Sequence, residues 1–388
     1  MIETLALSLF LAALPLEQFA AMGVTVLKLA GGLAFLAWLF GRLRALSPIR
    51  WDPGLTLMVF FVGWGAVSGL WSADRAATMA ALPTYALLIL SYFLILNVVR
   101  SEKQLSVVMI GMWLGTLVLL ASGAVDMAGV LRGAETHRVA GISGNANGYV
   151  AMLVACIPSG YWFFTRTRAP FRRVVAVAVV VVAAATTLYS LSRGGVIAII
   201  VFLLTLLIYR QTRRRGMVFA VVLLVFGYLV APSSFWERWE ETRSYGDIRT
   251  KELWPAGLRA VARHPALGSG LGAGLGGKVV HNAPLTVAVE LGLPGLALYL
   301  GFIAYATVRL LRALSAALKQ GRSKECAFAI VLLASFLGYM ATWFKGGGAE
   351  YGKVLWVLLG LMSAYAWILE QPPGVDDAEP GDSGREET

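Results

Sequence analysis

Residues 232–284 read PSSFWERWEETRSYGDIRTKELWPAGLRAVARHPALGSGLGAGLGGKVVHNAP, the long polar interval of the chain. On both sides of it, apolar runs alternate with short charged segments. Because roughly 20 apolar residues are needed to cross a bilayer as a helix, this alternation predicts transmembrane helices. We therefore expect an all-α integral membrane protein with an extracytoplasmic helical loop domain at residues 232–284.

The composition favours the same class. Of 388 residues, 58% are hydrophobic and 14% are charged, which is typical of an integral membrane protein. The net charge of +11 would suggest nucleic acid in a soluble protein, but Lys and Arg collect in cytoplasmic loops of membrane proteins, so no nucleic-acid partner is expected. The apolar start at residues 1–15 lacks a basic leader region and is expected to be a retained span. Cys156 and Cys326 predict neither a disulfide nor a thiolate metal site.

Twelve apolar segments are predicted to span the membrane. They are residues 2–16, 19–40, 53–70, 80–99, 105–123, 148–164, 174–190, 195–209, 216–231, 285–308, 326–344 and 353–369. With the N-terminus inside, five inner loops hold eighteen Lys and Arg residues, which predicts this orientation. The resulting organisation is a nine-span bundle at 1–231, the loop domain, a three-span bundle at 285–370 and a disordered cytoplasmic tail at 371–388.

Part of the loop is predicted to be an amphipathic helix. Residues 251–264 have helical spacing, with Trp254 and Leu258 on an apolar stripe and Arg259 and Arg263 on the other face. The two arginines are explained equally well by lipid headgroups and by a substrate.

The glycine run that follows contains a formal GxGxxG at Gly272–Gly277. It follows no predicted strand, so a dinucleotide-binding turn is rejected. A flexible hinge is favoured over a loop whose amides approach a phosphate.

Other chemistries find little support in the outer loops. They contain no DxD, no HExxH and no GxSxG pattern, so neither a metal site nor a serine nucleophile is predicted. Lys28 and Glu290 lie inside predicted spans, where charges are usually paired or functional. A structural Lys28–Glu290 pair, or separate partners, explains them at least as well as catalysis.

Three outer arginines and a histidine remain: Arg138, Arg193, Arg249 and His281. Arg193 lies in the short turn 192–195, which must hold its side chain at the rim of the bundle. Fork-shaped, permanently charged guanidinium groups suit a diphosphate. The alternative for a single rim arginine is contact with a lipid headgroup.

Four short sequence motifs occur around these residues. They are His137-Arg138 through Asn145-Ala-Asn147, Ser190-Leu-Ser-Arg-Gly-Gly195, Arg249 through Trp254 to Pro265-Ala-Leu-Gly-Ser-Gly270, and His281-Asn282 followed after nine residues by Gly292-Leu-Pro-Gly295. Together they resemble the O-antigen ligase and polymerase superfamily of bacterial membrane glycosyltransferases. Ala146 departs from the family, in which proline is common at this position.

The resemblance implies a GT-C-type glycosyltransferase fold in the bacterial inner membrane, with its active face in the periplasm. It implies an undecaprenyl-diphosphate-linked glycan donor and transfer with inversion, without a metal or cofactor. The acceptor is lipid A–core in the ligase branch and a lipid-linked glycan in the polymerase branch. The predicted catalytic residues are His281, Arg193 and Arg249. The predicted binding residues for the diphosphate or acceptor are Arg138, Asn145, Asn147, Arg259, Arg263 and Asn282.

Ligation is favoured over polymerisation, although the motifs separate the two poorly. A second class of function is a non-enzymatic twelve-span transporter of lipids or solutes, and a third is a scaffold for envelope assembly. Transporters usually show two similar halves with charged sites near the midplane. Residues 1–190 and 191–388 show no such repeat, and the polar residues gather on one face.

Overall fold

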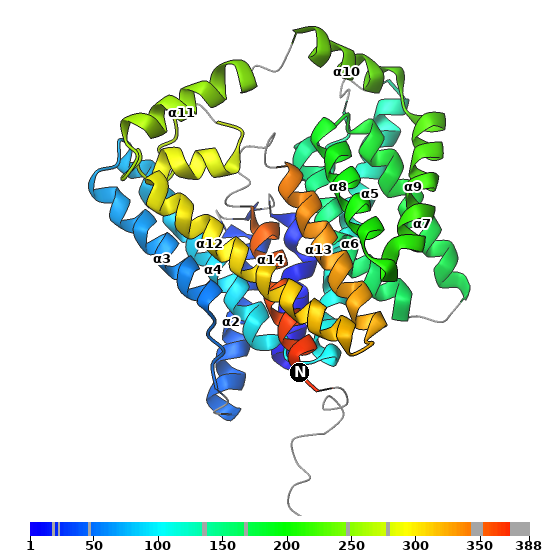
Figure 1. The fold of residues 1–388 in the computed structure, drawn as a ribbon, viewed down its shortest axis with the longest axis horizontal. Helices are drawn as coiled ribbons and strands as arrows, with labels where there is room; N and C mark the ends of the chain where they lie inside the picture. Colours follow the sequence, from blue (N-terminus) through cyan, green and yellow to red (C-terminus); the bar gives the residue numbers. More distant parts are fainter. Residues whose placement is uncertain are drawn as a thin grey trace, which may run out of the picture.

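The computed structural model describes residues 1–17, 20–21, 24–45, 48–133, 138–166, 170–245, 249–276, 280–342 and 352–372. It is a bundle of long helices (Figure 1). The α-helices are α1 (Ile2–Ala12), α2 (Val26–Ala45), α3 (Pro53–Val67), α4 (Arg75–Val98), α5 (Glu102–Leu131), α6 (Ala146–Arg166), α7 (Pro170–Tyr189), α8 (Arg193–Ile208), α9 (Arg210–Val230), α10 (Ser233–Tyr245), α11 (Trp254–Arg263), α12 (Ala283–Lys319), α13 (Ser323–Ala341) and α14 (Lys353–Glu370). Short elements are the 3₁₀ turns η1 (Leu14–Leu16), η2 (Ser68–Leu70) and η3 (Gly141–Ser143), the π-helical turn η4 (Arg249–Leu253), and the two-residue strands β1 (Ala20–Ala21) and β2 (Val24–Thr25).

The chain is an all-α membrane protein apart from the antiparallel β1–β2 pair. In the part of the chain that the structure describes, eight helices are long and apolar enough to cross a membrane: α2, α3 with η2, α4, α5, α6, α12, α13 and α14. The other four expected spans coincide with α1, α7, α8 and α9. Of these, α1, the Val177–Tyr189 part of α7 and α8 are apolar but short, and α9 opens with the cationic stretch RQTRRR. Twelve spans therefore stays a prediction. The second expected span begins later than predicted, at Val26, because β1 and β2 precede it.

The core is centred on α14. Its residues are buried on every side of the helix, as expected for a helix that is apolar all round. Trp356 lies within ring-contact distance of Phe61, Tyr85 and Phe302, with centroids 5.0–6.5 Å apart. These rings join α3, α4 and α12 to α14, so helices distant in sequence share one core.

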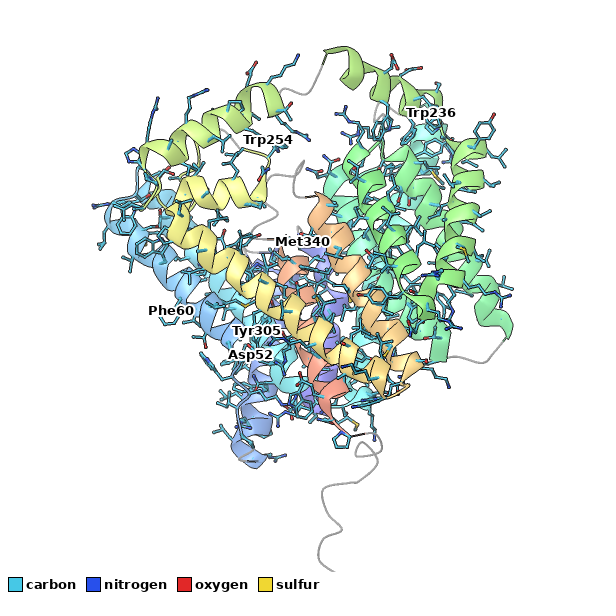
Figure 2. All side chains as sticks on the ribbon, viewed as in Figure 1. Asp52, Phe60, Trp236, Trp254, Tyr305 and Met340 are labelled. Carbon is cyan, nitrogen blue, oxygen red and sulfur yellow. The ribbon has the colours of Figure 1, made fainter. Side chains whose placement is uncertain are left out.

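One end of the bundle is rich in arginine, and we call it the cationic end; Arg50, Arg100, Arg166, Arg309 and Arg322 lie there. Arg309 contacts carboxylates from two other elements, Asp52 and Glu370, each at 3.3 Å. Asp52 and Tyr305, both labelled in Figure 2, lie at this end of the bundle.

Buried polar contacts order the same end. Asp52 also caps α3 by accepting the Leu55 amide at 2.8 Å. Arg50 lies over the Trp367 ring, 3.3 Å from its centroid. Burial, followed by the charges of Arg100 and Arg309, lowers the pKa of Arg50 to about 10, so the side chain still carries its charge at neutral pH. The charged side chains of the cationic end are therefore held by contacts with several helices.

Helix α12 is broken near its start. Gly292 has φ 66° and ψ −171°, which separates a short first segment from the long remainder (Figure 1). This backbone region is essentially restricted to glycine. The expected span at 285–308 lies within α12 and includes this break.

Candidate active site

The first group of predicted site residues surrounds the turn between α7 and α8. Ser192 caps α8, because its hydroxyl accepts the Gly195 amide at 3.1 Å. The same hydroxyl donates to Asn147 Oδ1 at 2.8 Å, which ties this turn to the start of α6. The Arg138 Nε–H donates to the carbonyl of Ser190 at 3.0 Å. We call Arg138, Asn147, Ser190, Ser192 and Arg193 the turn cluster.

Arg193 begins α8 directly after this cap and is half-buried. Its neighbour Gly195 permits a close approach between helices, since a Cβ there would lie 2.4 Å from Val150 Cγ1 of α6. Leu191 has φ 54°, although its side chain is branched and buried. The turn is thus held tightly on both sides of the arginine.

Asn145 shapes the segment before α6. Its Oδ1 accepts the amides of Asn147 and Gly148 at 2.9 and 3.2 Å, and the residue itself is exposed. Upstream, Asp126 Oδ2 accepts the Gly141 amide at 2.6 Å. Both asparagines therefore have structural roles in the loop. His137, which was predicted to precede Arg138 in this motif, lies outside the described residues.

The second group is the segment leading into α12. Asn282 caps the helix, because its Oδ1 accepts the Leu285 amide at 3.0 Å. His281 precedes the cap with φ 56° and is half-buried. In the described part of the chain, Leu191 and His281 are the non-glycine residues with a positive φ. Each of them lies within two residues of a predicted catalytic or capping side chain.

The glycine-rich loop packs into the break of α12. The amides of Ser269 and Gly270 donate to the carbonyls of Val289 and Glu290 at 2.9 and 2.8 Å. Leu293, just after the break, donates its amide to Pro265 at 2.7 Å. We call residues 265–272 and 281–293 together the loop cluster. The two family motifs Pro-x-x-Gly-x-Gly and Gly-x-x-Gly are therefore one packed unit.

The same loop also docks on the α3–α4 turn. The Leu271 amide donates to Ser68 Oγ at 3.0 Å, and Thr78 Oγ1 donates to the Leu271 carbonyl at 2.7 Å. A Cβ on Gly270 would lie 2.2 Å from Ser72 Oγ. The predicted hinge is not supported for residues 265–272, which are anchored, and their bonded amides are not available to a phosphate. Gly277, the last glycine of the GxGxxG pattern, lies outside the described residues.

The proposed Lys28–Glu290 pair is wrong. Glu290 is 8% exposed and its Oε2 accepts the Gly272 amide at 2.8 Å. Lys28 is an exposed residue of α2 that lines a small cavity with Lys353. The buried Glu290 carboxylate accepts a hydrogen bond within the loop cluster. Lys28 and Glu290 therefore have separate partners, which was the other explanation.

The helix predicted at residues 251–264 is present as α11, Trp254–Arg263. Arg249 opens η4 and is half-buried, whereas Arg259 and Arg263 on α11 are exposed. The buried face of α11 centres on Gly257, where a Cβ would lie 3.0 Å from Leu285 Cδ2. Leu258, expected on the apolar stripe, is 62% exposed. Helix α11 therefore lies on the first segment of α12, with its arginines pointing away from that contact.

Both clusters lie at the end of the bundle opposite the cationic end (Figure 1). Helix α12 runs from Asn282 to the Arg309–Asp52 pair, and α6 runs from Asn147 to the Arg166–Glu102 pair. Arg193 and His281 are thus on one face of the molecule. Within the described residues, no group of three or more His, Cys, Asp or Glu could hold a metal ion.

The comparison with protein families concerns one segment of the chain. Residues 178–300 match the family model described as O-Antigen ligase. This match, over about a third of the chain, supports the predicted membership of the O-antigen ligase and polymerase superfamily. No curated protein matches the chain.

The superfamily match contains much of the candidate site. It covers the turn at Ser190–Gly195, helix α11 and the loop cluster, whereas Arg138, Asn145 and Asn147 precede it. This O-antigen ligase or polymerase-type chain is a multi-pass membrane enzyme. The family implies lipid-linked glycan and lipid A–core type partners in general.

Two tryptophans of the site were not foreseen. Trp64 Nε1 donates to the Leu291 carbonyl at 2.9 Å, and Trp71 Nε1 donates to Leu267 at 3.1 Å. Both brace the loop cluster from α3 and the turn after it. Nothing in the sequence indicates these contacts, because the partners lie 227 and 196 residues apart.

Proposed function

We propose that this superfamily member transfers a glycan from an undecaprenyl diphosphate carrier to lipid A–core. The reaction takes place at the periplasmic face of the inner membrane, by single displacement with inversion and without a metal. The enzyme has twelve spans and a GT-C-type arrangement.

The observation that carries the proposal is the constrained backbone conformation next to the Arg193 and His281 side chains. Leu191 and His281 both occupy left-handed conformations, which cost about 1–3 kcal/mol each and tend to persist at functional sites. The helix caps of Ser192 and Asn282 follow directly. Such an arrangement fixes a guanidinium and an imidazole on rigid helix starts, as catalysis by positioning requires.

The chemistry asks for charge stabilisation and one proton transfer. The acceptor hydroxyl oxygen attacks the anomeric carbon, the bond from that carbon to the diphosphate oxygen breaks, and the diphosphate leaves with the electron pair. Arg193 and Arg249, helped by Arg138, bind the diphosphate and stabilise its developing charge. His281 takes the hydroxyl proton, because an imidazole can act as a base near neutral pH.

The remaining binding residues have graded roles. Asn147 and Asn282 act through the turns that they hold, and Asn145 through the segment before α6. Arg259 and Arg263 are exposed beside the loop cluster, and they contribute charge that attracts an anionic donor.

The test of enzyme against transporter is a transfer assay in detergent with purified protein, undecaprenyl-diphosphate-linked glycan and lipid A–core. We expect a new glycosidic product, because no membrane gradient is required. Absence of product with both lipid A–core and a lipid-linked acceptor would favour transport or scaffolding.

Polymerisation is the alternative within the superfamily, with another lipid-linked repeat as acceptor. Mass spectrometry of glycans from a deletion strain separates the two branches. Ligation predicts full-length chains stranded on the carrier lipid. Unpolymerised single repeats would point to a polymerase.

A further inference from the structure

The cationic end contains a polar cavity of about 830 Å³. Four cations line it, Arg166, Arg210, Arg215 and Lys324, together with the carboxylates of Glu102 and Glu325. Arg166 is paired with Glu102 at 2.7 Å. Arg210 and Lys324 are exposed and have no ion pair among the described residues. The cavity therefore carries an excess of positive charge that suits an anion.

A second cavity of about 690 Å³ adjoins it between α5, α6, α7, α8 and α9. Its walls are almost wholly apolar, formed by side chains such as Trp113, Ile157, Ala184, Phe202 and Val218. This volume lies in the range of pockets that bind small ligands, roughly 300–1,000 Å³. We call it the apolar chamber.

The two cavities share part of their lining. Tyr161, Thr165 and Arg215 belong to both, and Arg215 Nη1 donates to Tyr161 Oη at 2.5 Å where they meet. A cationic compartment beside an apolar one matches a molecule with an anionic head and a hydrocarbon tail. An inner membrane surface rich in anionic lipid supplies such molecules to a cationic end that the distribution of Lys and Arg predicts to be cytoplasmic.

We propose that these cavities bind one anionic phospholipid, with its phosphate headgroup at Arg210, Arg215 and Lys324 and acyl chain in the apolar chamber. This site lies at the opposite end of the bundle from the turn and loop clusters, so it is independent of the proposed reaction. The bound lipid fills space between α7, α8 and α9 that side chains leave open.

Native mass spectrometry of the full chain in detergent tests the headgroup compartment. Phosphatidylglycerol is added to the protein, with phosphatidylethanolamine of the same chains in parallel. Each cation near an anionic headgroup contributes about a five-fold change, so Arg210→Ala/Lys324→Ala should weaken phosphatidylglycerol binding about 25-fold. The matched control Arg312→Ala/Lys319→Ala removes two exposed charges at the same end, outside both cavities, and should bind normally.

The chamber is tested with a filling variant and a short lipid. Ala184→Phe should reduce retention of phosphatidylglycerol, whereas Ala316→Phe on the exposed side of α12 should not. Dihexanoyl phosphatidylglycerol keeps the headgroup but shortens the tail, and it should bind wild-type protein at least ten-fold more weakly. This arm needs no variant, so it stands even if Ala184→Phe fails to fold.

Three results would overturn the proposal. The first is equal binding of the two phospholipids, and the second is equal loss in both charge-removal pairs. The third is displacement of phosphatidylglycerol by undecaprenyl phosphate with no effect of the charge changes, which would assign the chamber to the tail of the glycan donor.

Discussion

The turn cluster and the loop cluster hold their key side chains by different means. Around Arg193, side-chain hydroxyl and amide groups form the hydrogen bonds that hold the turn: the Ser192 hydroxyl accepts from the Gly195 amide and donates to Asn147. Around His281, the backbone of one segment bonds the backbone of another, and glycines allow the contact. Removal of single polar side chains should therefore destabilise the turn cluster in small steps, whereas a single Cβ added at Gly292 should disrupt the loop cluster.

The largest expected effect is that of Gly292→Ala. An alanine there would adopt a backbone conformation that glycine alone tolerates, with its Cβ 2.7 Å from the Ala266 backbone. We expect a loss of at least about 3 kcal/mol, measured by thermal unfolding in detergent. Gly32→Ala is the control, because its Cβ would meet nothing within 4 Å. A Gly292→Ala protein as stable as wild type would show that the break is not required.

Next in size is the carboxylate beneath the glycine loop. Glu290→Ala removes the carboxylate that accepts the Gly272 amide, and loss of a hydrogen bond to a charged group should cost about 1.5–3 kcal/mol of unfolding free energy. Glu290→Gln keeps an acceptor oxygen and should cost less. If both variants unfold at the same temperature, the hydrogen bond to Gly272 does not support the loop.

A smaller effect is expected in the turn cluster. Ser192→Ala removes the cap of α8 and the contact with Asn147, for a loss of about 1 kcal/mol. Ser192→Thr keeps the hydroxyl and is the control. A double-mutant cycle with Asn147→Ala should give a coupling of about 0.5 kcal/mol or more. Simple additivity would mean that the two side chains do not support each other.

The smallest effect concerns α11. Arg259→Ala and Arg263→Ala each remove an exposed charge, and each should lower the rate of glycan transfer by no more than about five-fold. Rates measured at low and high salt should converge, because exposed charges are screened. A hundred-fold loss would instead place these arginines in direct contact with the substrate.

The local features of both clusters were predictable from sequence. Ser192 precedes Gly195 by three residues, and Asn282 stands before Ala-Pro, so each helix start is encoded within a few positions. The turn predicted at 192–195, from its shortness between two apolar segments, ends earlier, because α8 already begins at Arg193. Such features depend on neighbours in the chain, and the structure agrees with them.

The long-range features could not be predicted. Glu290 and Gly272 face each other because α12 breaks at Gly292, yet apolar residues continue across the break and indicate one span at 285–308. Lys28 and Glu290 were paired only because both are charges in apolar runs. The hydrogen bond from Trp64 to the Leu291 carbonyl could not be predicted either, since donor and acceptor are 227 residues apart.

The most direct test of the central claim is the rate of glycan transfer by His281→Ala and Arg193→Ala proteins in detergent. Their matched controls are His264→Ala and Arg132→Ala, which alter exposed residues at the same end of the bundle. Loss of a positioned charge-stabilising or proton-accepting group should lower the rate on the order of 10²–10³-fold, with the controls close to wild type. Near-normal turnover in both His281→Ala and Arg193→Ala, in folded protein, would contradict the account.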